Sequence, residues 1–214
     1  MNPCKMKSLH FILILFFIVS CNTREHKEST SLDTHNFLKG FPVFTKDSLI
    51  NVVVEIPAGT DQKWEVNKIT GHIEWERIHE DSLRIVKFLP YPANYGFIPQ
   101  TLLPKEQGGD GDPLDVFLLG PSMERGNVVP SRIIGVIKML DKGEQDDKLI
   151  AVAADSHFGD IKSLDDLIEE YPGALEILKS WLSNYKGKGF IEILSVENEE
   201  KALVLLQTAK DAFK

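Results

Sequence analysis

The chain has 214 residues, of which 43% are hydrophobic and 9% aromatic, and its formal net charge at pH 7 is −8. A chain of this length can bury one good hydrophobic core but is short for two, so a single domain is expected. The excess of acidic residues argues against nucleic acid and anionic membrane surfaces as partners.

The first residues differ from the rest of the chain. Lys5 and Lys7 precede nine uninterrupted apolar residues at 11–19. This run is about half of the ~20 residues that a membrane-spanning helix needs, so it indicates a signal-peptide core. The following Ile18-Val19-Ser20-Cys21 resembles the lipobox of bacterial lipoproteins. Residues 1–20 are therefore predicted to be a lipoprotein signal peptide and Cys21 the lipid-bearing first residue. An ordinary cleavage site followed by a chance cysteine is the alternative.

A lipid on Cys21 would anchor the exported protein to a membrane of the bacterial cell envelope, on the periplasmic or outer-membrane side. Cys4 lies in the segment predicted to be removed, so the mature chain would have no cysteine pair for an internal disulfide. Loss of residues 1–20 removes Lys5 and Lys7 and no acid, which changes the net charge from −8 to −10. Residues 21–40 are predicted to be a flexible tether, because most of them are polar and lack periodicity, and 41–214 to be the folded domain.

Strand-like runs rich in Val and Ile open the domain, and helical patterns come late. Strands before helices, without βαβ alternation, predict an α+β fold that is mainly β, a small antiparallel barrel packed by helices. Ser163 is the predicted N-cap of the first helix. The expected strands are 49–56, 64–67, 72–75, 84–89, 115–119, 132–140, 149–154 and 190–194, and the expected helices are 164–171, 172–185 and 198–213.

Three aspartates, Asp110, Asp112 and Asp115, lie within six residues among glycines and a proline that favour a tight turn. Such crowding of carboxylates is costly unless a cation lies among them, and carboxylate oxygens suit Mg²⁺. No cysteine or suitably spaced histidine pair nearby suggests zinc. A solvated acidic loop is an equally good interpretation of this segment alone. An EF-hand is excluded, because its sixth and twelfth positions counted from Asp110 hold Asp115 and Pro121.

A second acidic group, Asp141, Glu144, Asp146 and Asp147, follows the predicted strand 132–140 and leads through Lys148 into the next strand. If these strands are hairpin neighbours, the carboxylates and Lys148 gather at one end of the barrel. An ordinary charged hairpin loop is the alternative.

Together these segments resemble the family I soluble inorganic pyrophosphatases, from about residue 52 to residue 186. The matching motifs occur in the family's order: Val54-Glu55-Ile56-Pro57, Lys63-Trp64-Glu65, Tyr91-Pro92-Ala93-Asn94-Tyr95-Gly96, Asp110-Gly111-Asp112-Pro113-Leu114-Asp115-Val116, the loop with Asp141, Asp146 and Lys148, and Tyr185-Lys186. The resemblance implies a five-stranded OB-like antiparallel barrel with flanking helices. It also implies an enzyme that uses several Mg²⁺ ions per active site, inorganic pyrophosphate as substrate, and assembly as a homo-oligomer.

The resemblance further implies roles for individual residues. Asp112 is expected to be the general base that takes a proton from metal-activated water. The expected metal-binding residues are Asp110, Asp115, Asp141 and Asp146, with Glu55 acting through metal-bound water. The expected substrate-binding residues are Lys63, Arg84, Tyr95, Lys148, Tyr185 and Lys186, with Glu65 and Tyr91 in support.

The identity of the pocket arginine depends on how the segment between Gly71 and Tyr91 is aligned, because it is longer than in the shorter family members. Counting from Gly71 selects Arg77, and counting back from Tyr91 selects Arg84. Arg84 is preferred, since 84–91 has no obvious turn to absorb a gap. Two other functions stay open: a non-catalytic, lipid-anchored module that binds metal or phosphate, and a hydrolase of another phosphoanhydride.

Overall fold

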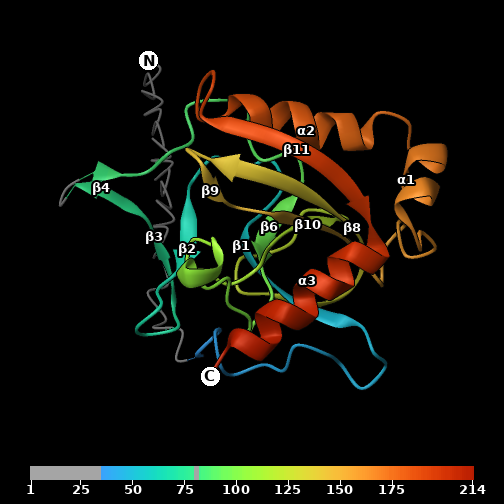
Figure 1. Cartoon of the computed structure of the whole chain (residues 1–214), viewed down its shortest axis with the longest axis horizontal. Coiled ribbons are helices and arrows are strands. Elements are labelled where there is room, and N and C mark those ends of the chain that lie inside the picture. The colour runs from blue at the N-terminus through green and yellow to red at the C-terminus, as the bar shows by residue number, and fades with distance from the viewer. Residues whose placement is uncertain (1–34, 80–81) are drawn as a thin grey trace, which may run out of the picture. The chain divides into compact units, whose positions relative to one another are not determined.

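The computed structural model describes residues 35–79 and 82–214 (Figure 1). The predicted signal peptide, Cys21 and most of the predicted tether lie outside the described residues. Within these two ranges, no helix has both the length and the apolar character needed to cross a membrane. Phe37 and Leu38 are buried, and the Phe37 amide donates to the Gly71 carbonyl at 2.8 Å. The packed part of the chain thus starts before the predicted boundary at residue 41, because apolar side chains follow the polar stretch directly.

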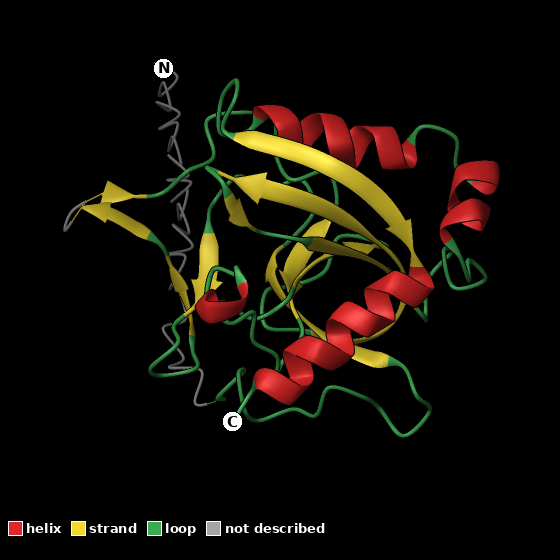
Figure 2. Cartoon of the chain, in the orientation of Figure 1, coloured by secondary structure: helices red, strands yellow, loops and turns green. Residues whose placement is uncertain are grey.

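Five strands close into a ring (Figures 1 and 2). It runs β1 (Ile50–Ile56), β6 (Asn94–Phe97), β7 (Asp115–Leu119), β10 (Lys148–Ala153) and β8 (Val128–Asp141), and β8 pairs back onto β1. This ring is the predicted OB-like barrel. The prediction of an all-antiparallel barrel is wrong at one junction, where β7 and β10 run parallel. No hairpin joins these two strands, because β8 lies between them in the sequence.

The long strand β8 holds the barrel together. Its first residues pair with β1, and its second half pairs with β11 (Ile191–Asn198), which extends the sheet beyond the ring. At its end β8 turns through Lys142 and Gly143, which have φ angles of 52° and 89°, into the short strand β9 (Glu144–Gln145). Two successive positive φ angles are typical of the type I′ turn that favours a tight hairpin.

Strand β6 was not predicted from the sequence. It is short, contains Gly96 and has no run of β-branched residues. Gly96 is required there, since a Cβ at this position would lie 1.8 Å from the Val53 carbonyl oxygen of β1. The residue therefore permits the close approach of β6 to β1.

Two small hairpins lie outside the ring: β2 (Trp64–Val66) with β3 (Ile73–Trp75), and β4 (Arg77–His79) with β5 (Ser82–Leu83). The predicted strand 84–89 is wrong. A bridge between Gln62 and Ile85 and isolated backbone hydrogen bonds of Arg84 and Val86 tie its start to neighbouring segments, but they form no continuous ladder. Apart from Val86, its apolar side chains remain exposed, so no partner strand continues the pairing.

The three predicted helices are present as α1 (Leu164–Glu170), α2 (Ala174–Asn184) and α3 (Glu199–Ala212), with a 3₁₀ turn, η1 (Lys105–Gln107), before the acidic loop. Ser163 is the N-cap of α1, as predicted, and forms a capping box with Asp166. Helix α2 buries an apolar face that includes Leu178 and Trp181.

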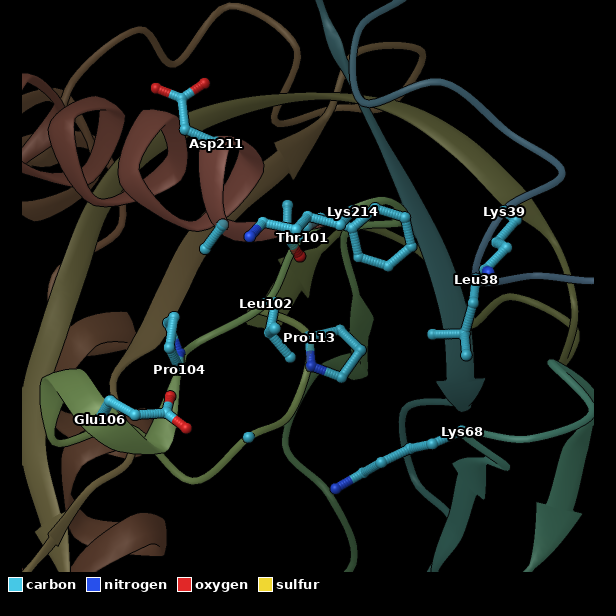
Figure 3. A pocket seen from close by; sticks show the side chains of 13 residues that line it. Leu38, Lys39, Lys68, Thr101, Leu102, Pro104, Glu106, Pro113, Asp211 and Lys214 are labelled. Atoms are coloured by element: carbon cyan, nitrogen blue, oxygen red, sulfur yellow. The ribbon is translucent and has the colours of Figure 1, made fainter.

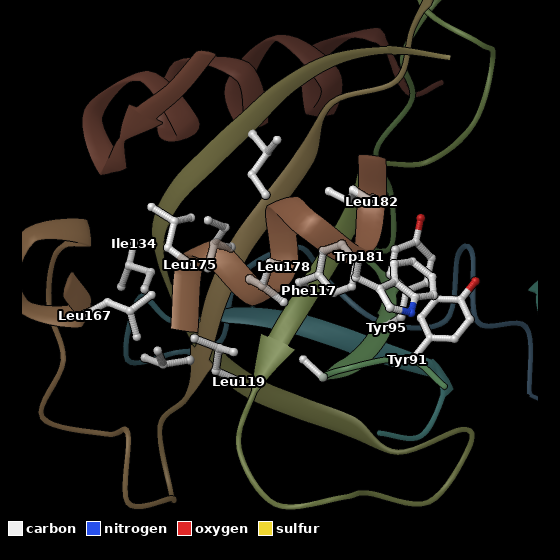
Figure 4. Packing of buried hydrophobic residues seen from close by; sticks show 14 of the residues in the cluster. Tyr91, Tyr95, Phe117, Leu119, Ile134, Leu167, Leu175, Leu178, Trp181 and Leu182 are labelled. Atoms are coloured by element: carbon white, nitrogen blue, oxygen red, sulfur yellow. The ribbon is translucent and has the colours of Figure 1, made fainter. Parts of the chain in front are cut away.

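That apolar face of α2 packs on aromatic side chains from β6 and β7 (Figure 4). The Trp181 ring lies 4.5 Å from the ring of Tyr91 and 4.4 Å from that of Tyr185, and Tyr95 packs edge-on against Phe117. Such contacts favour a rigid arrangement. The core thereby fixes Tyr91, Tyr95 and Tyr185, three residues that the sequence analysis connected with a substrate pocket.

Candidate active site

Charged side chains from widely separated segments line one pocket of about 300 Å³. Seven carboxylates and five cationic side chains face it, an excess of two negative charges. Its lining residues are Lys63, Glu65, Lys68, Arg84, Tyr95, Asp110, Asp112, Asp115, Asp141, Glu144, Asp146, Lys148, Tyr185 and Lys186. We call it the carboxylate pocket.

The centre of the carboxylate pocket is built by the parallel junction. Asp115 starts β7 and Lys148 starts β10, and the two residues face each other in the register of these strands. The Lys148 ammonium lies 2.5 Å from Asp115 Oδ2 and also contacts Asp146. Burial favours the neutral form of Lys148, but Asp115 and Asp146 outweigh this effect and hold its pKa above the ordinary lysine value. Lys148 is therefore a buried, charged group.

The wall of the pocket formed by the end of β8 carries a second ion pair. Asp141 Oδ2 accepts a hydrogen bond from the Lys186 ammonium, which follows α2. The other oxygen, Asp141 Oδ1, is buried and has no hydrogen-bond partner in the described structure. A buried acceptor without a partner is costly, so Asp141 offers a free position for a cation or a water molecule.

The loop between η1 and β7 positions Asp110 and Asp112. Gly111 adopts a φ of +81°, and the Asp112 amide donates to Asp110 Oδ1 at 2.9 Å, which fixes the turn. Burial and the neighbouring charges of Asp115 and Asp146 raise the pKa of Asp110 to about 7. The Asp112 carboxylate faces the pocket and contacts the ammonium of Lys68, a residue that the sequence analysis did not identify.

Two predicted residues lie behind the pocket rather than on its wall. Glu55 in β1 is 3% exposed, and its Oε1 accepts a hydrogen bond from the Val66 amide at 2.6 Å. Burial raises the pKa of Glu55 to about 8, although Lys63 counteracts the shift. Tyr91 is 3% exposed and belongs to the aromatic cluster. Both residues support groups that line the pocket.

Lys63 and Tyr95 complete the floor of the pocket. The Lys63 ammonium lies 5.7 Å from the centre of the Tyr95 ring and 3.6 Å from Glu65 Oε2. Burial disfavours charge on Lys63, but Tyr91 and Glu55 outweigh it and keep its pKa above the ordinary lysine value. Lys63 therefore stays cationic at the floor of a negatively charged pocket.

The structure brings Arg84 to the carboxylate pocket, whereas Arg77 is exposed on β4 and lines a different pocket. The Arg84 Nη1 atom donates to both oxygens of Glu76, at 2.8 and 2.7 Å. Backbone hydrogen bonds join Glu76 to Lys63 and to Arg84. Glu76 belongs to none of the matched motifs, so the sequence carried no signal for it.

A larger cavity lies elsewhere in the described part of the chain. It measures about 780 Å³ and lies between the end of α3, the segment 101–104 and the back of the acidic loop (Figure 3). None of the site residues predicted from the sequence lines it. Convergence of charged groups, and not cavity size, identifies the candidate site in this fold.

Comparison with known proteins agrees with the sequence motifs. A family model described as inorganic pyrophosphatase matches residues 52–214. The chain is 38% identical over 170 residues to a soluble inorganic pyrophosphatase of Oryza sativa subsp. indica, a match that covers 77% of this chain and 68% of the relative. It is 33% identical over 172 residues to the inorganic pyrophosphatase of Campylobacter jejuni, covering 77% of this chain and 92% of the relative. This chain belongs to the inorganic pyrophosphatase family.

A solved member of the inorganic pyrophosphatase family shares the fold. The type I inorganic pyrophosphatase of P. falciparum superimposes with a TM-score of 0.75 at 27% identity, covering 83% of this chain and 62% of that chain. The present chain thus spans less than two thirds of that solved protein.

Membership of the inorganic pyrophosphatase family implies a divalent metal cofactor, and the donor set of the pocket fits one. All candidate ligands are carboxylates, the negative charges exceed the positive ones, and Asp141 Oδ1 lacks a partner. Among the described residues, however, no three acidic, cysteine or histidine side chains are grouped as metal ligands, and lysines contact Asp115, Asp141 and Asp146. A bound dication would therefore have to rearrange these lysine contacts.

Proposed function

We propose that this chain hydrolyses inorganic pyrophosphate to two phosphates. The proposal is supported by the convergence of carboxylates and cations from both ends of the domain in one pocket, on a fold shared with inorganic pyrophosphatases. To hold a multiply charged anion, such a pocket needs both kinds of group: carboxylates that bind the metal ions and cationic side chains that contact the anion itself. A non-catalytic binding module has no need of a carboxylate such as Asp112, which lines the pocket and pairs there with Lys68.

The cationic side chains would bind the phosphoryl oxygens. Lys148 is buried and Lys63 is partly exposed, and both remain charged, while Arg84 and Lys186 line two adjacent pockets. Tyr95 and Tyr185 add hydroxyl groups at the floor, and burial raises the pKa of Tyr185 to about 12, so it is a hydrogen-bond donor at neutral pH. These groups orient pyrophosphate and neutralise charge on the departing phosphate.

Asp112 is the proposed general base. Its side chain is 42% exposed, lines the pocket and follows the glycine turn that separates it from Asp110. It would take the proton from the attacking water as the bond to phosphorus forms. Asp110, Asp115, Asp141 and Asp146 would hold divalent cations, proposed to be Mg²⁺, which when bound lower the pKa of the attacking water and neutralise phosphate charge.

Phosphate release from pyrophosphate by the purified full chain tests this function. We expect release that requires a divalent cation and is faster with Mg²⁺ than with Mn²⁺ or Ca²⁺. An absence of release above background with all three cations would contradict hydrolysis of pyrophosphate. Release in the presence of a chelator would contradict the role of the metal.

We also propose that the exported protein is anchored to a membrane of the bacterial cell envelope through a lipid on Cys21. The support is the apolar run followed by Val19-Ser20-Cys21. Cells expressing the chain in the presence of a labelled fatty acid should label the wild type and not Cys21→Ser. An unlabelled wild type would contradict the anchor.

The homo-oligomer implied by the family resemblance is part of the same proposal. Exposed apolar side chains such as Phe88 and Leu89, which are 42% and 66% exposed, are available for contacts between subunits. Sedimentation of the purified chain in detergent should give a mass of at least two subunits, and a monomer at micromolar concentration would contradict it.

A further inference from the structure

A second pocket adjoins the carboxylate pocket. It measures about 380 Å³, and its charged lining residues are Arg84, Lys87, Lys142 and Lys186. Arg84, Tyr185 and Lys186 line both pockets, so the two spaces share a wall. We call the second space the cationic pocket.

The two pockets have opposite charge. The carboxylate pocket is faced by seven carboxylates, whereas no carboxylate lines the cationic pocket. Asp141 and Glu76, which lie outside the cationic pocket, pair with two of its four cations and offset the positive charge only in part. The remaining positive charge would be stabilised by an anion in the pocket. The charge pattern therefore favours an anionic group that enters the cationic pocket without a metal ion.

Two of the four cations are available to a ligand. Lys186 pairs with Asp141 and Arg84 with Glu76, but in the described part of the chain neither Lys87 nor Lys142 has an acidic partner. The Lys142 ammonium lies 5.5 Å from the centre of the Phe190 ring, at the edge of the pocket. Solvated surface lysines are common, but these two face the same pocket as two substrate-binding cations.

The backbone also holds Lys142 in an uncommon conformation. Its φ of 52° lies in the left-handed region, at a turn position that asparagine or glycine usually occupies. Its amide donates to the Phe190 carbonyl at 3.0 Å, which ties the turn to the segment after α2. A costly backbone conformation that points a lysine at a pocket is an observation from which a function can be argued.

We infer that the cationic pocket is a subsite for the third phosphoryl group of a linear tripolyphosphate, so that this chain also hydrolyses tripolyphosphate. This inference rests on the proposed function. Two phosphoryl groups would occupy the carboxylate pocket, and the next group along the chain would pass Arg84 and Lys186 and meet Lys87 and Lys142. Water adds to the terminal phosphorus in the carboxylate pocket, and Asp112 takes its proton. The bond from that phosphorus to the bridging oxygen breaks, and pyrophosphate leaves with this oxygen and the electron pair.

The first test compares kcat/KM for tripolyphosphate with kcat/KM for pyrophosphate. The variant is Lys87→Gln/Lys142→Asn, because asparagine keeps the left-handed turn while removing the charge. The matched control is Lys188→Gln, an exposed lysine that lines neither pocket. We expect the ratio of tripolyphosphate to pyrophosphate kcat/KM to fall about tenfold in the double variant, as two exposed charge contacts are lost, and to be unchanged in the control. A ratio that changes by less than twofold, or that changes equally in the control, would overturn the inference.

The second test measures binding without catalysis. Titration calorimetry with inorganic tripolyphosphate, on the full chain in a chelator, removes any contribution of divalent ions. We expect the double variant to bind tripolyphosphate about tenfold more weakly than the wild type. Because no turnover is needed, this result would support the subsite even if pyrophosphate hydrolysis failed.

Orthophosphate provides the comparison ligand in the same calorimeter. If the cationic pocket serves only longer phosphate chains, the double substitution should change orthophosphate binding by less than twofold. If orthophosphate binding weakens as much as tripolyphosphate binding, the pocket is a site for a free anion, and the extension of the substrate site is wrong.

Discussion

At the scale of single residues, the candidate site depends on lysines and carboxylates that hold each other in place. Lys148 lies between Asp115 and Asp146, Lys186 contacts Asp141, and Lys68 contacts Asp112. For the buried Lys148, the two carboxylates hold the pKa above the ordinary lysine value although burial alone would favour the neutral form. When substrate and metal ions bind, the lysines can exchange carboxylate oxygens for phosphate oxygens without leaving the pocket.

Asp112→Asn tests the general base. Asparagine keeps the shape of the side chain but cannot take a proton, so turnover of pyrophosphate should fall by about 10²- to 10⁴-fold. Steady-state phosphate release is the measurement, with Asp155→Asn, an exposed aspartate outside the pocket, as the control. Near-normal turnover in Asp112→Asn would show that another group is the general base.

Glu76→Gln tests the positioning of Arg84. The bidentate contact with Glu76 fixes the guanidinium at the wall shared by the two pockets, and a neutral amide holds it less firmly. We expect KM for pyrophosphate to rise about tenfold, with a smaller change in kcat, since a charge-assisted contact is weakened. Glu74→Gln is the control, because Glu74 accepts a hydrogen bond from Asn67 and does not line the carboxylate pocket. An unchanged KM would show that the backbone alone orients Arg84.

The sequence identified most of the side chains that line the pocket, because they belong to short motifs in which unusual residue types recur at fixed spacing. Lys68 and Glu76 were missed, since one lies in an ordinary turn and the other precedes an arginine in an extended segment. Their contacts depend on how β2, β3 and the segment around Arg84 fold back on one another. Single-sequence patterns carry no such information.

At the scale of secondary structure elements, periodic segments were predicted well and irregular ones were not. The helices and the buried strand β7 follow apolar patterns that do not depend on distant contacts. The segment 84–89 carries the residues of a strand but finds no partner, and β6 is a strand because of its two neighbours. In both cases, pairing with neighbouring segments determines whether a strand forms.

Gly96→Ala tests the close contact of β6 with β1. A Cβ at this position would lie 1.8 Å from the Val53 carbonyl oxygen, so the two strands would have to separate. We expect the free energy of unfolding in urea to fall by more than about 3 kcal/mol, or the protein not to fold. Gly189→Asn is the control, because this glycine has open space around it and a φ of +84° that asparagine tolerates. A loss below about 1 kcal/mol in Gly96→Ala would show that the strands adjust easily.

The capping box of α1 gives a prediction for pH dependence. Hydrogen bonds from the Lys162 amide and from Ser163 lower the pKa of Asp166 below its ordinary value. A carboxylate whose pKa is lower in the folded protein stabilises the fold above its unfolded pKa of about 3.9 and loses this effect as the pH falls through its folded pKa. Urea unfolding of the wild type and Asp166→Asn should therefore differ at pH 7, with the wild type more stable. This difference should shrink below about pH 4. A difference independent of pH would mean that the charge of Asp166 has no part in the cap.

At the scale of the whole molecule, the fold gathers negative charge in one place and offsets it only in part. The barrel brings the starts of β7 and β10 together with the end of β8, so that seven carboxylates face five cations. Self-repulsion of this kind opposes the folded state. Divalent cations that bind the pocket should therefore stabilise the protein as well as support catalysis.

Thermal unfolding in Mg²⁺ tests this coupling. A ligand that binds only the folded state at 100 times its Kd adds about 2.7 kcal/mol, which for a domain of this size corresponds to a rise in Tm of about 5–10 °C. Scanning fluorimetry of the wild type should show this rise in MgCl₂ and not in NaCl of the same ionic strength. Asp115→Asn should reduce the rise, because it removes a carboxylate at the centre of the pocket, whereas Asp155→Asn should retain it. Equal rises in MgCl₂ and NaCl would indicate general screening of surface charge. The same rise in Asp115→Asn as in the wild type would indicate that the ions bind elsewhere.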